Sequence, residues 1–234
     1  MNALRAPTGG AEITAILNGV RGKVGTADVK AAEAFATLVC AELGTQELAR
    51  RGVDTWAALI ADLFGWFRNR PAEHASVRAF NPDREHHGWT CPHSVVEVVS
   101  DDMPFLVDSL EMVVAGAGLR LHRLIHPVLD IKRDARGNVE VIGLEGDDRS
   151  AESVMHAEID RVDAATLGKL QALAEVALGD VHAAVNDWQA MHDKMLVIAD
   201  ALPEEKTTLD AEEVAEGQAF LRWAAENHFT FLGY

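Results

Sequence analysis

The sequence SDDMPFLVD, residues 100–108, marks a change from extended to helical structure. Immediately before it, residues 95–99 read VVEVV and carry one charge, Glu97, which is typical of a strand buried on both faces. The two aspartates can accept hydrogen bonds from free N–H groups at a helix start, and the proline is tolerated in a first turn because it has no N–H. The stretch therefore predicts a strand, a turn and a helix that begins at about Met103.

The hydrophobic period changes downstream of this turn. Apolar residues recur at helical spacing over 106–117 and then alternate over 119–132, which predicts a helix followed by one long strand. Residues 133–138 have turn chemistry and lead into apolar residues from Val139, so we expect a hairpin. Residues 154–162 alternate again and predict one more, half-buried strand. The sheet should therefore contain about four strands.

Helical patterns flank the predicted sheet on both sides in the sequence. Before it, the spacing of apolar residues predicts helices over 11–24, 29–43 and 54–67. After it, a period near 3.5 over 167–202 predicts a long helix. We expect this helix to pack on its own sheet rather than on a coiled-coil partner, because its heptads are irregular.

The last residues predict one more helix and the beginning of a strand. Asp210 and Glu213 have the spacing of a capping box at the start of the helix. Residues 229–234, FTFLGY, alternate aromatic or apolar residues with small ones, which favours a strand. Because such a strand at a terminus would leave an unpaired edge, we expect the chain to be the front piece of a longer protein.

Together these patterns predict an α+β fold in four parts. Residues 1–70 form a helical N-terminal segment, and 71–93, with three prolines and several polar residues, form a connector. Residues 94–202 form an α+β domain with helices packed on one face of an antiparallel sheet. Residues 203–234 hold a helix and the start of a strand that leads into a missing downstream part. We expect the strand edges or the second sheet face to pair with another copy or with downstream modules.

The composition excludes several classes of protein. The 234 residues carry 21 basic and 37 acidic side chains, a formal net charge of −16, which repels phosphate backbones and anionic bilayers. We therefore expect no nucleic-acid and no membrane partner. No run of apolar residues is long enough for a membrane helix, no export signal is visible at the start, and the two cysteines, Cys40 and Cys91, lie in different predicted elements. These features predict a cytoplasmic protein.

The sequence shows no recognisable catalytic or metal-binding motif. His86, His87, Cys91 and His93 are of the types that bind zinc, but their spacing matches no common site, so we interpret them as solvated loop residues and expect no metal. The glycine fingerprint of dinucleotide-binding folds is missing, as is a phosphate loop. We therefore predict no catalytic residue and no cofactor in this chain.

The turn itself is the best candidate for a ligand site. Its aspartates are interpreted first as helix caps and second as polar groups that bind an effector, and two nearby histidines on one strand face could contact the same ligand. Alternatively, the two histidines have a purely structural role, partly buried and hydrogen-bonded to the backbone. The residues predicted for an effector site are Asp101, Asp102, Met103, Pro104, His122 and His126.

The order of elements resembles that of the ACT domain, a small-molecule-sensing module with a ferredoxin-like fold. In that family an Asp-x-Pro-Gly turn commonly leads into the first helix. Here Asp102, Met103 and Pro104 fit the pattern, whereas Phe105 stands where the glycine usually gives the backbone room for a ligand. The resemblance implies an ACT-like sheet and an amino acid as effector.

A more specific resemblance covers residues from about 54 to the end. The motifs at 101–109, 126–127, 158–161, 187–188 and 228–234 resemble, in this order, the N-terminal region of the large bacterial NAD-specific glutamate dehydrogenases. This resemblance implies ACT-like modules at the front and a dehydrogenase domain far downstream, so that NAD and the catalytic residues belong to the parent enzyme. The parent would deaminate L-glutamate oxidatively to 2-oxoglutarate and ammonium.

Three hypotheses for function follow. The leading one is a non-catalytic regulatory and oligomerisation segment whose partners are other copies of itself and downstream domains of the same chain. The second is an autonomous amino-acid-sensing ACT-type module. The third, an unrelated free-standing enzyme, is the least favoured because no catalytic constellation is visible.

Overall fold

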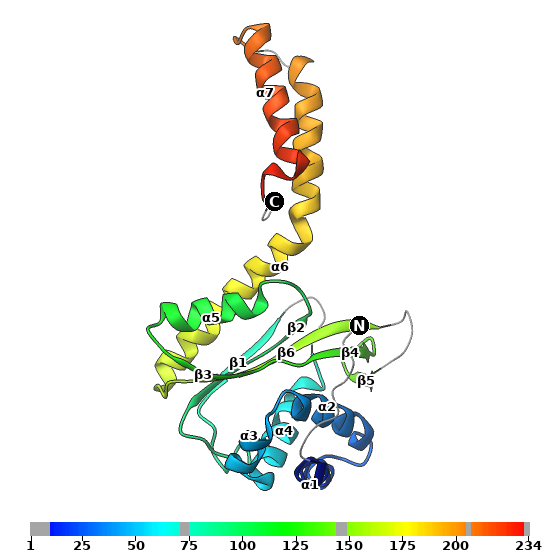
Figure 1. Ribbon diagram of the computed structural model, residues 1–234, viewed down its shortest axis with the longest axis vertical. Helices are drawn as coiled ribbons and strands as arrows, with labels where there is room; N and C mark the ends of the chain where they lie inside the picture. Colours follow the sequence, from blue (N-terminus) through cyan, green and yellow to red (C-terminus); the bar gives the residue numbers. More distant parts are fainter. Residues whose placement is uncertain (1–9, 71–74, 144–148, 205–206, 232–234) are drawn as a thin grey trace.

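The computed structural model describes residues 10–70, 75–143, 149–204 and 207–231. Figure 1 shows an antiparallel sheet with helices on both faces and a helical hairpin that projects away from it. The N-terminal part is helical, as predicted. Its helices are α1 (Gly10–Arg21), α2 (Val29–Ala41), α3 (Thr45–Arg51) and α4 (Val53–Phe67).

The first four helices pack tightly on one another. The rings of Phe35 and Phe67 stack with centroids 5.0 Å apart, and both side chains are fully buried. A Cβ atom at Gly19 would lie 2.6 Å from the Cβ of Ala57, so α1 and α4 touch backbone to side chain at that point. Burial of each large side chain contributes about 1.5–3 kcal/mol to stability.

The described residues form a six-stranded antiparallel sheet. Five strands follow the order β1-β2-β6-β4-β5, and the sixth, β3, pairs with β6 outside this order. The strands are β1 (Ser76–Phe80), β2 (Ser94–Asp101), β3 (Leu121–Ile125), β4 (Val128–Arg133), β5 (Val139–Ile142) and β6 (Ser150–Ile159). The central strand β6 pairs with β2 on one side and with both β3 and β4 on the other. The hairpin predicted at 133–138 is confirmed, with Gly137 at a φ of 80°.

The two faces of the sheet are covered by different parts of the chain. On β2, Val96 and Val98 pack in the cluster formed with α5 (Leu106–Gly116) and α6 (Ala164–Ala201), which confirms helices on one face of an ACT-like sheet. Val95 and Val99, which alternate with them, pack in the cluster of α1–α4. The expectation that the second face is available for another copy is therefore wrong, because the N-terminal helices of the same chain cover it.

Several local predictions need correction. The long strand predicted over 119–132 is two strands, β3 and β4, interrupted at His126 and Pro127, with a register shift between Leu121 and Arg123. Strand β1 lies within residues interpreted as a connector. Strand β6 was expected to be half-buried, but both of its faces are buried over most of its length.

The turn between β2 and α5 also differs from the prediction. Helix α5 begins at Leu106 and not at Met103, and its N-cap residue is Phe105, whose backbone is left-handed with a φ of 74°. None of the described side chains caps the helix. Phe105 therefore adopts the conformation that glycine takes most easily, at the position where ACT turns commonly have glycine.

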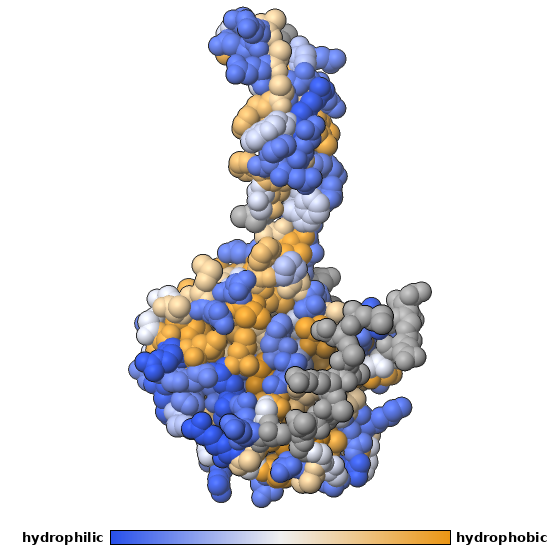
Figure 2. Space-filling model, viewed as in Figure 1, coloured by the Kyte–Doolittle hydropathy of each residue, from blue (hydrophilic) through white to orange (hydrophobic). Residues whose placement is uncertain are grey.

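Helix α6 continues beyond the sheet and forms an arm with the residues that follow it (Figure 1). The arm consists of the end of α6, the 3-10 turn η1 (Leu202–Glu204), α7 (Ala211–Trp223) and the π-helical turn η2 (Ala224–His228). The capping box predicted at Asp210 and Glu213 is present. Figure 2 shows apolar side chains at the surface of this arm. Among the described helices, none has the length and hydropathy needed to cross a bilayer.

The strand predicted from Phe229 is not formed over residues 229–231. Residues 229–231 have no strand pairing, and 232–234 lie outside the described residues.

Candidate functional site

A row of buried charged side chains lies at the boundary between the sheet and the N-terminal helices. Glu97 on β2 and His156 on β6 are cross-strand partners, and Oε1 of Glu97 lies 2.7 Å from Nδ1 of His156. Glu158, two residues further along β6, lies 3.5 Å from the other ring nitrogen of His156. All three side chains are almost completely buried, on the face covered by α1–α4.

One arginine from the sheet and one from the N-terminal helices neutralise this row of charges. Arg78 of β1 donates through Nε to Oε2 of Glu97 at 2.5 Å and through Nη2 to Asp62 of α4 at 3.0 Å. Arg51, at the end of α3, pairs with Glu158, and its guanidinium lies 4.6 Å from the centre of the Trp56 ring. Buried charges of this kind are stable only when they are paired.

The network shifts the pKa values of its members. Burial alone would raise the pKa of Glu158, but its interactions with His156 and the charge of Arg51 outweigh burial and lower the pKa to about 2. Burial would lower the pKa of His156, but its interactions with the carboxylates of Glu158 and Glu97 outweigh burial and raise the pKa. The pKa of Glu97 is lowered as well, because its contacts with His156 and Arg78 outweigh the effect of burial. The protonated imidazole between two carboxylates is thus the favoured state.

A cavity of about 500 Å³ opens beside this row, where α3 meets β3 and the loop before β2. Glu158 is therefore shared by the buried network and the cavity wall. The lining residues are Glu47, Arg50, Arg51, Thr55, Thr90, Cys91, Pro92, His93, His122, Arg123 and Glu158.

Most polar groups of the cavity have partners within the protein. Arg123 pairs with Glu47, and His122 lies 2.7 Å from Asp160 through Nε2. The rings of His93 and His122 stack with centroids 4.2 Å apart. The cavity therefore has a cationic side, from the end of α3 and from β3, and a wall of two imidazole rings.

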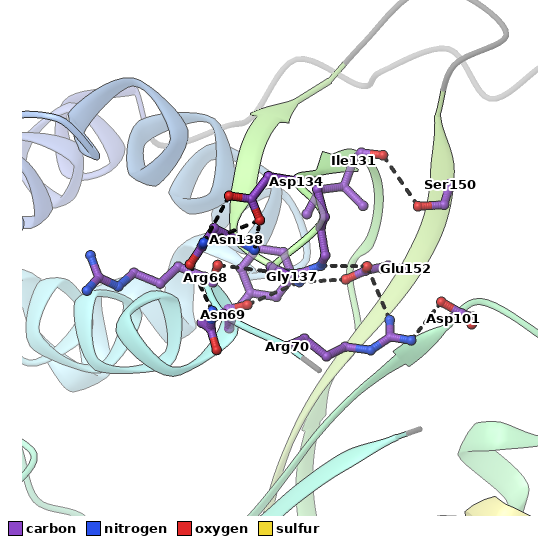
Figure 3. A network of polar contacts seen from close by, with 12 residues as sticks. Arg68, Asn69, Arg70, Asp101, Ile131, Asp134, Gly137, Asn138, Ser150 and Glu152 are labelled. Atoms are coloured by element: carbon purple, nitrogen blue, oxygen red, sulfur yellow. Dashed lines mark hydrogen bonds and ion pairs between the residues drawn. The ribbon is translucent and has the colours of Figure 1, made fainter. Parts of the chain in front are cut away.

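A second polar cluster attaches the end of α4 to the sheet (Figure 3). The carboxylate of Glu152 on β6 accepts two hydrogen bonds from Arg133 of β4, at 2.7 and 2.8 Å, and lies 3.1 Å from Nη1 of Arg70. The backbone N–H of Arg70 donates to the carbonyl of Gly137 at 3.1 Å. This cluster fixes the β4–β5 hairpin against the N-terminal helices.

The structure separates the six residues predicted for an effector site. His122 lines the cavity, whereas His126 lies 3.0 Å from the hydroxyl of Ser153, which donates to Asp102 at 2.5 Å. Burial lowers the pKa of His126, partly offset by the charge of Asp102. Only Asp102 and His126 are thus brought together, through Ser153.

The other predicted residues have separate environments. Asp101 pairs with Arg70, so neither aspartate caps α5. Met103 packs at the edge of the cluster of α5 and α6, and Pro104 lines a different cavity of about 400 Å³ at the base of the arm.

The histidines of the predicted connector also fall into two groups. His86 and His87 lie beside Asp83, while Cys91 and His93 line the cavity. Within the described residues, no three His, Cys, Asp or Glu side chains are arranged to hold a metal ion.

Sequence reasoning missed the arginines of the cavity and of the buried network. The available signal was Glu97, a lone charge in a run of valines, together with His156 and Glu158 on the next central strand. Three charges on strands at the centre of a sheet require buried partners, and only the fold shows that Arg51 and Arg78 supply them.

The fold defines an α+β module of the ACT type, extended by N-terminal helices and by an arm. The match to a family model is more specific, since residues 35–174 match the family described as "Glutamate dehydrogenase, ACT1 domain". The chain belongs to this family, as the motifs at 101–109 and 126–127 implied.

Two curated relatives agree with this assignment. The chain is 36% identical over 209 residues to the NAD-specific glutamate dehydrogenase of Pseudomonas aeruginosa. The aligned region covers 87% of this chain and 12% of that relative. It is 32% identical over 212 residues to the NAD-specific glutamate dehydrogenase of Halomonas elongata, with 88% of this chain and 13% of the relative covered. The chain thus spans a small part of the length of the relatives that it matches.

Proposed function

We propose that the chain is a non-catalytic regulatory and assembly segment of an NAD-specific glutamate dehydrogenase. The parent enzyme would oxidise L-glutamate to 2-oxoglutarate and ammonium and reduce NAD, with NAD bound by a part of the protein beyond this chain. The names of the two relatives support the parent reaction. The share of their length that the chain matches supports a role other than catalysis.

The single observation that carries the assembly role is the projecting arm. Its helices expose large apolar side chains that no other described element covers, including Val197, which is 60% exposed. The others on the arm are Trp188, Leu196, Ile198, Leu209, Phe220, Trp223 and Phe229. Surfaces of this kind mark sites of protein association, and the proposed partners are another copy of the chain and the downstream domains.

The assembly role is tested in the full-length enzyme with Val197→Glu. A charge on the apolar surface should reduce the mass of the assembly measured by light scattering and change the steady-state kinetics. Thr208→Glu is the matched control, because Thr208 is exposed in the loop before α7 and gains the same charge. Equal mass and kinetics for the wild type and both variants would exclude the assembly role. Formation of NADH by the isolated chain with L-glutamate would exclude the non-catalytic role.

A second candidate function is amino-acid sensing at the turn before α5. The observation that favours it is the left-handed backbone of Phe105, at the position where ACT turns commonly have glycine. Titration calorimetry with a panel of amino acids tests this candidate. Heat that is lost in Asp102→Ala would support it, and silence across the panel at millimolar concentration would remove it.

A further inference from the structure

We propose that the cavity between α3 and β3 binds a small carboxylate that carries one net negative charge. The inference rests on the proposed function, because such a ligand would act as an effector of the parent enzyme. Binding itself depends only on residues of this chain. The site differs from the turn before α5 and shares only His122 with the residues predicted for effector binding.

The charge balance of the cavity favours an anion. Its lining includes three arginines and two glutamates. Both glutamates have partners, since Glu47 pairs with Arg123, and Glu158 pairs with Arg51 and His156. The guanidinium of Arg50 makes no hydrogen bond or ion pair with any other described residue. The lining therefore has one unbalanced positive charge, that of Arg50, although the formal net charge of the chain is −16.

The hydrogen-bond inventory indicates the same ligand chemistry. Nη1 of Arg51 is buried and has no hydrogen-bond acceptor among the described residues. A buried donor without an acceptor destabilises the protein, so an oxygen ligand at this place is favourable. Arg50 and Arg51 are adjacent in the last turn of α3, and a guanidinium presents paired donors that match the two oxygens of a carboxylate.

The remaining features of the cavity restrict the size and charge of the ligand. Its volume of about 500 Å³ is in the range of small-molecule sites, about 300–1,000 Å³. The stacked rings of His93 and His122 provide a flat wall for the rest of the ligand. Phosphate is less favourable because it carries about −1.5 to −2 charges and would face both glutamates. A cation is less favourable because neither glutamate is free.

Calorimetry on the 234-residue chain with four probes tests the ligand class. Propionate and L-glutamate carry one net negative charge, whereas L-lysine is a cation and inorganic phosphate a more highly charged anion. We expect propionate or L-glutamate to bind at least about tenfold more tightly than L-lysine and phosphate, a difference of ~1.4 kcal/mol. Tighter binding of phosphate or L-lysine would overturn the proposal. So would silence from both carboxylates at millimolar concentration.

The variant Arg50→Ala tests the location. Because the Arg50 side chain has no partner among the described residues, its removal should leave the melting temperature unchanged and weaken carboxylate binding at least about tenfold. Arg84→Ala is the matched control, since Arg84 is an exposed arginine outside the cavity. Equal affinity in Arg50→Ala and the wild type would place the ligand elsewhere and overturn the proposal.

The full-length enzyme separates this inference from the proposed function. If the chain binds a carboxylate through Arg50 but the kinetics of the enzyme do not respond to that ligand, the regulatory role fails and the binding site stands. If no carboxylate binds, the site fails, and the assembly test with Val197→Glu is unaffected.

Discussion

His156 and Glu97 face each other across the two central strands of the sheet, with Nδ1 and Oε1 2.7 Å apart and both side chains buried. The pair lies where the N-terminal helices cover the sheet, and Arg78 extends it to Asp62 of α4. This polar link joins the sheet to α4, and our hypothesis is that it fixes the orientation in which the helices dock.

Glu97→Ala should be among the most destabilising single substitutions in the chain. It leaves Arg78 and His156 without their shared carboxylate, and breaking a buried ion pair costs about 3–5 kcal/mol. Urea denaturation measures the free energy of unfolding. Glu85→Ala removes an exposed glutamate and should change it by less than about 0.5 kcal/mol. Equal effects of the two variants would contradict the assigned role of the network.

The same network makes the stability of the protein depend on pH in two directions. His156 has a pKa above its ordinary 6.5, so its contribution is complete below pH 6.5 and is lost as the pH rises through the raised value. Glu158 has a pKa lowered from 4.5 to about 2, so its contribution is present above pH 4.5 and is lost as the pH falls toward 2.

A comparison of the wild type with His156→Phe therefore isolates the stability that His156 contributes and that is lost as the pH rises. The difference in unfolding free energy between the wild type and this variant should be larger at about pH 6 than at about pH 9. Urea denaturation at both pH values measures this difference. A difference that stays constant with pH would mean that folding leaves the pKa of His156 at its ordinary value, which would contradict the raised pKa.

Gly137→Ala should destabilise the hairpin that docks on Arg70. The residue has a φ of 80°, and a Cβ atom there would lie 1.9 Å from the carbonyl oxygen of Arg70. Gly143→Ala is the control, because Gly143 has a φ of 79° but no atom of the described residues lies within 4 Å of the added carbon. The control should cost about 1–2 kcal/mol for the left-handed backbone, and Gly137→Ala should cost more. Equal melting temperatures would contradict the close approach of the two segments.

Asp102→Asn should lower the pKa of His126 further. Burial already lowers this pKa, and the charge of Asp102 partly counteracts burial through the contact that Ser153 mediates. Titration of the His126 ring by NMR measures the shift. Asp108→Asn, which removes an exposed charge on α5, should leave it unchanged. A rise in the pKa of His126 in Asp102→Asn would exclude this coupling.

Local signals were sufficient for the elements whose geometry is determined locally. The capping box at Asp210 and the turn at Gly137 were predictable because a few neighbouring residues specify each of them. Strand β1 was missed because it is a short edge strand that, within the described part of the chain, pairs with β2 alone. The start of α5 was misplaced because Asp101 and Asp102 bond to Arg70 and Ser153 instead of to the helix.

The candidate site was less predictable than the fold. Alternation along β6 correctly separated two faces, but the strand was predicted to be half-buried, whereas the face with His156 and Glu158 is buried as well. A sequence does not show what will cover a face. The cavity joins α3 to β3 across more than 70 residues, as the contact between Glu47 and Arg123 shows. No local pattern carries such a relationship, so Arg50 and Arg51 could not be recognised as lining residues.

The helices on both sides of the sheet have one further consequence, which concerns geometry between molecules. With α1–α4 on one face and α5 and α6 on the other, stacking of two sheets face to face is sterically blocked. Among the described residues, any hydrogen-bonded continuation of the sheet into a neighbouring molecule is limited to its edge strands, β1, β5 and β3, each of which pairs with one other strand. Such joining would lengthen the sheet laterally and leave the helical layers on both of its faces in place.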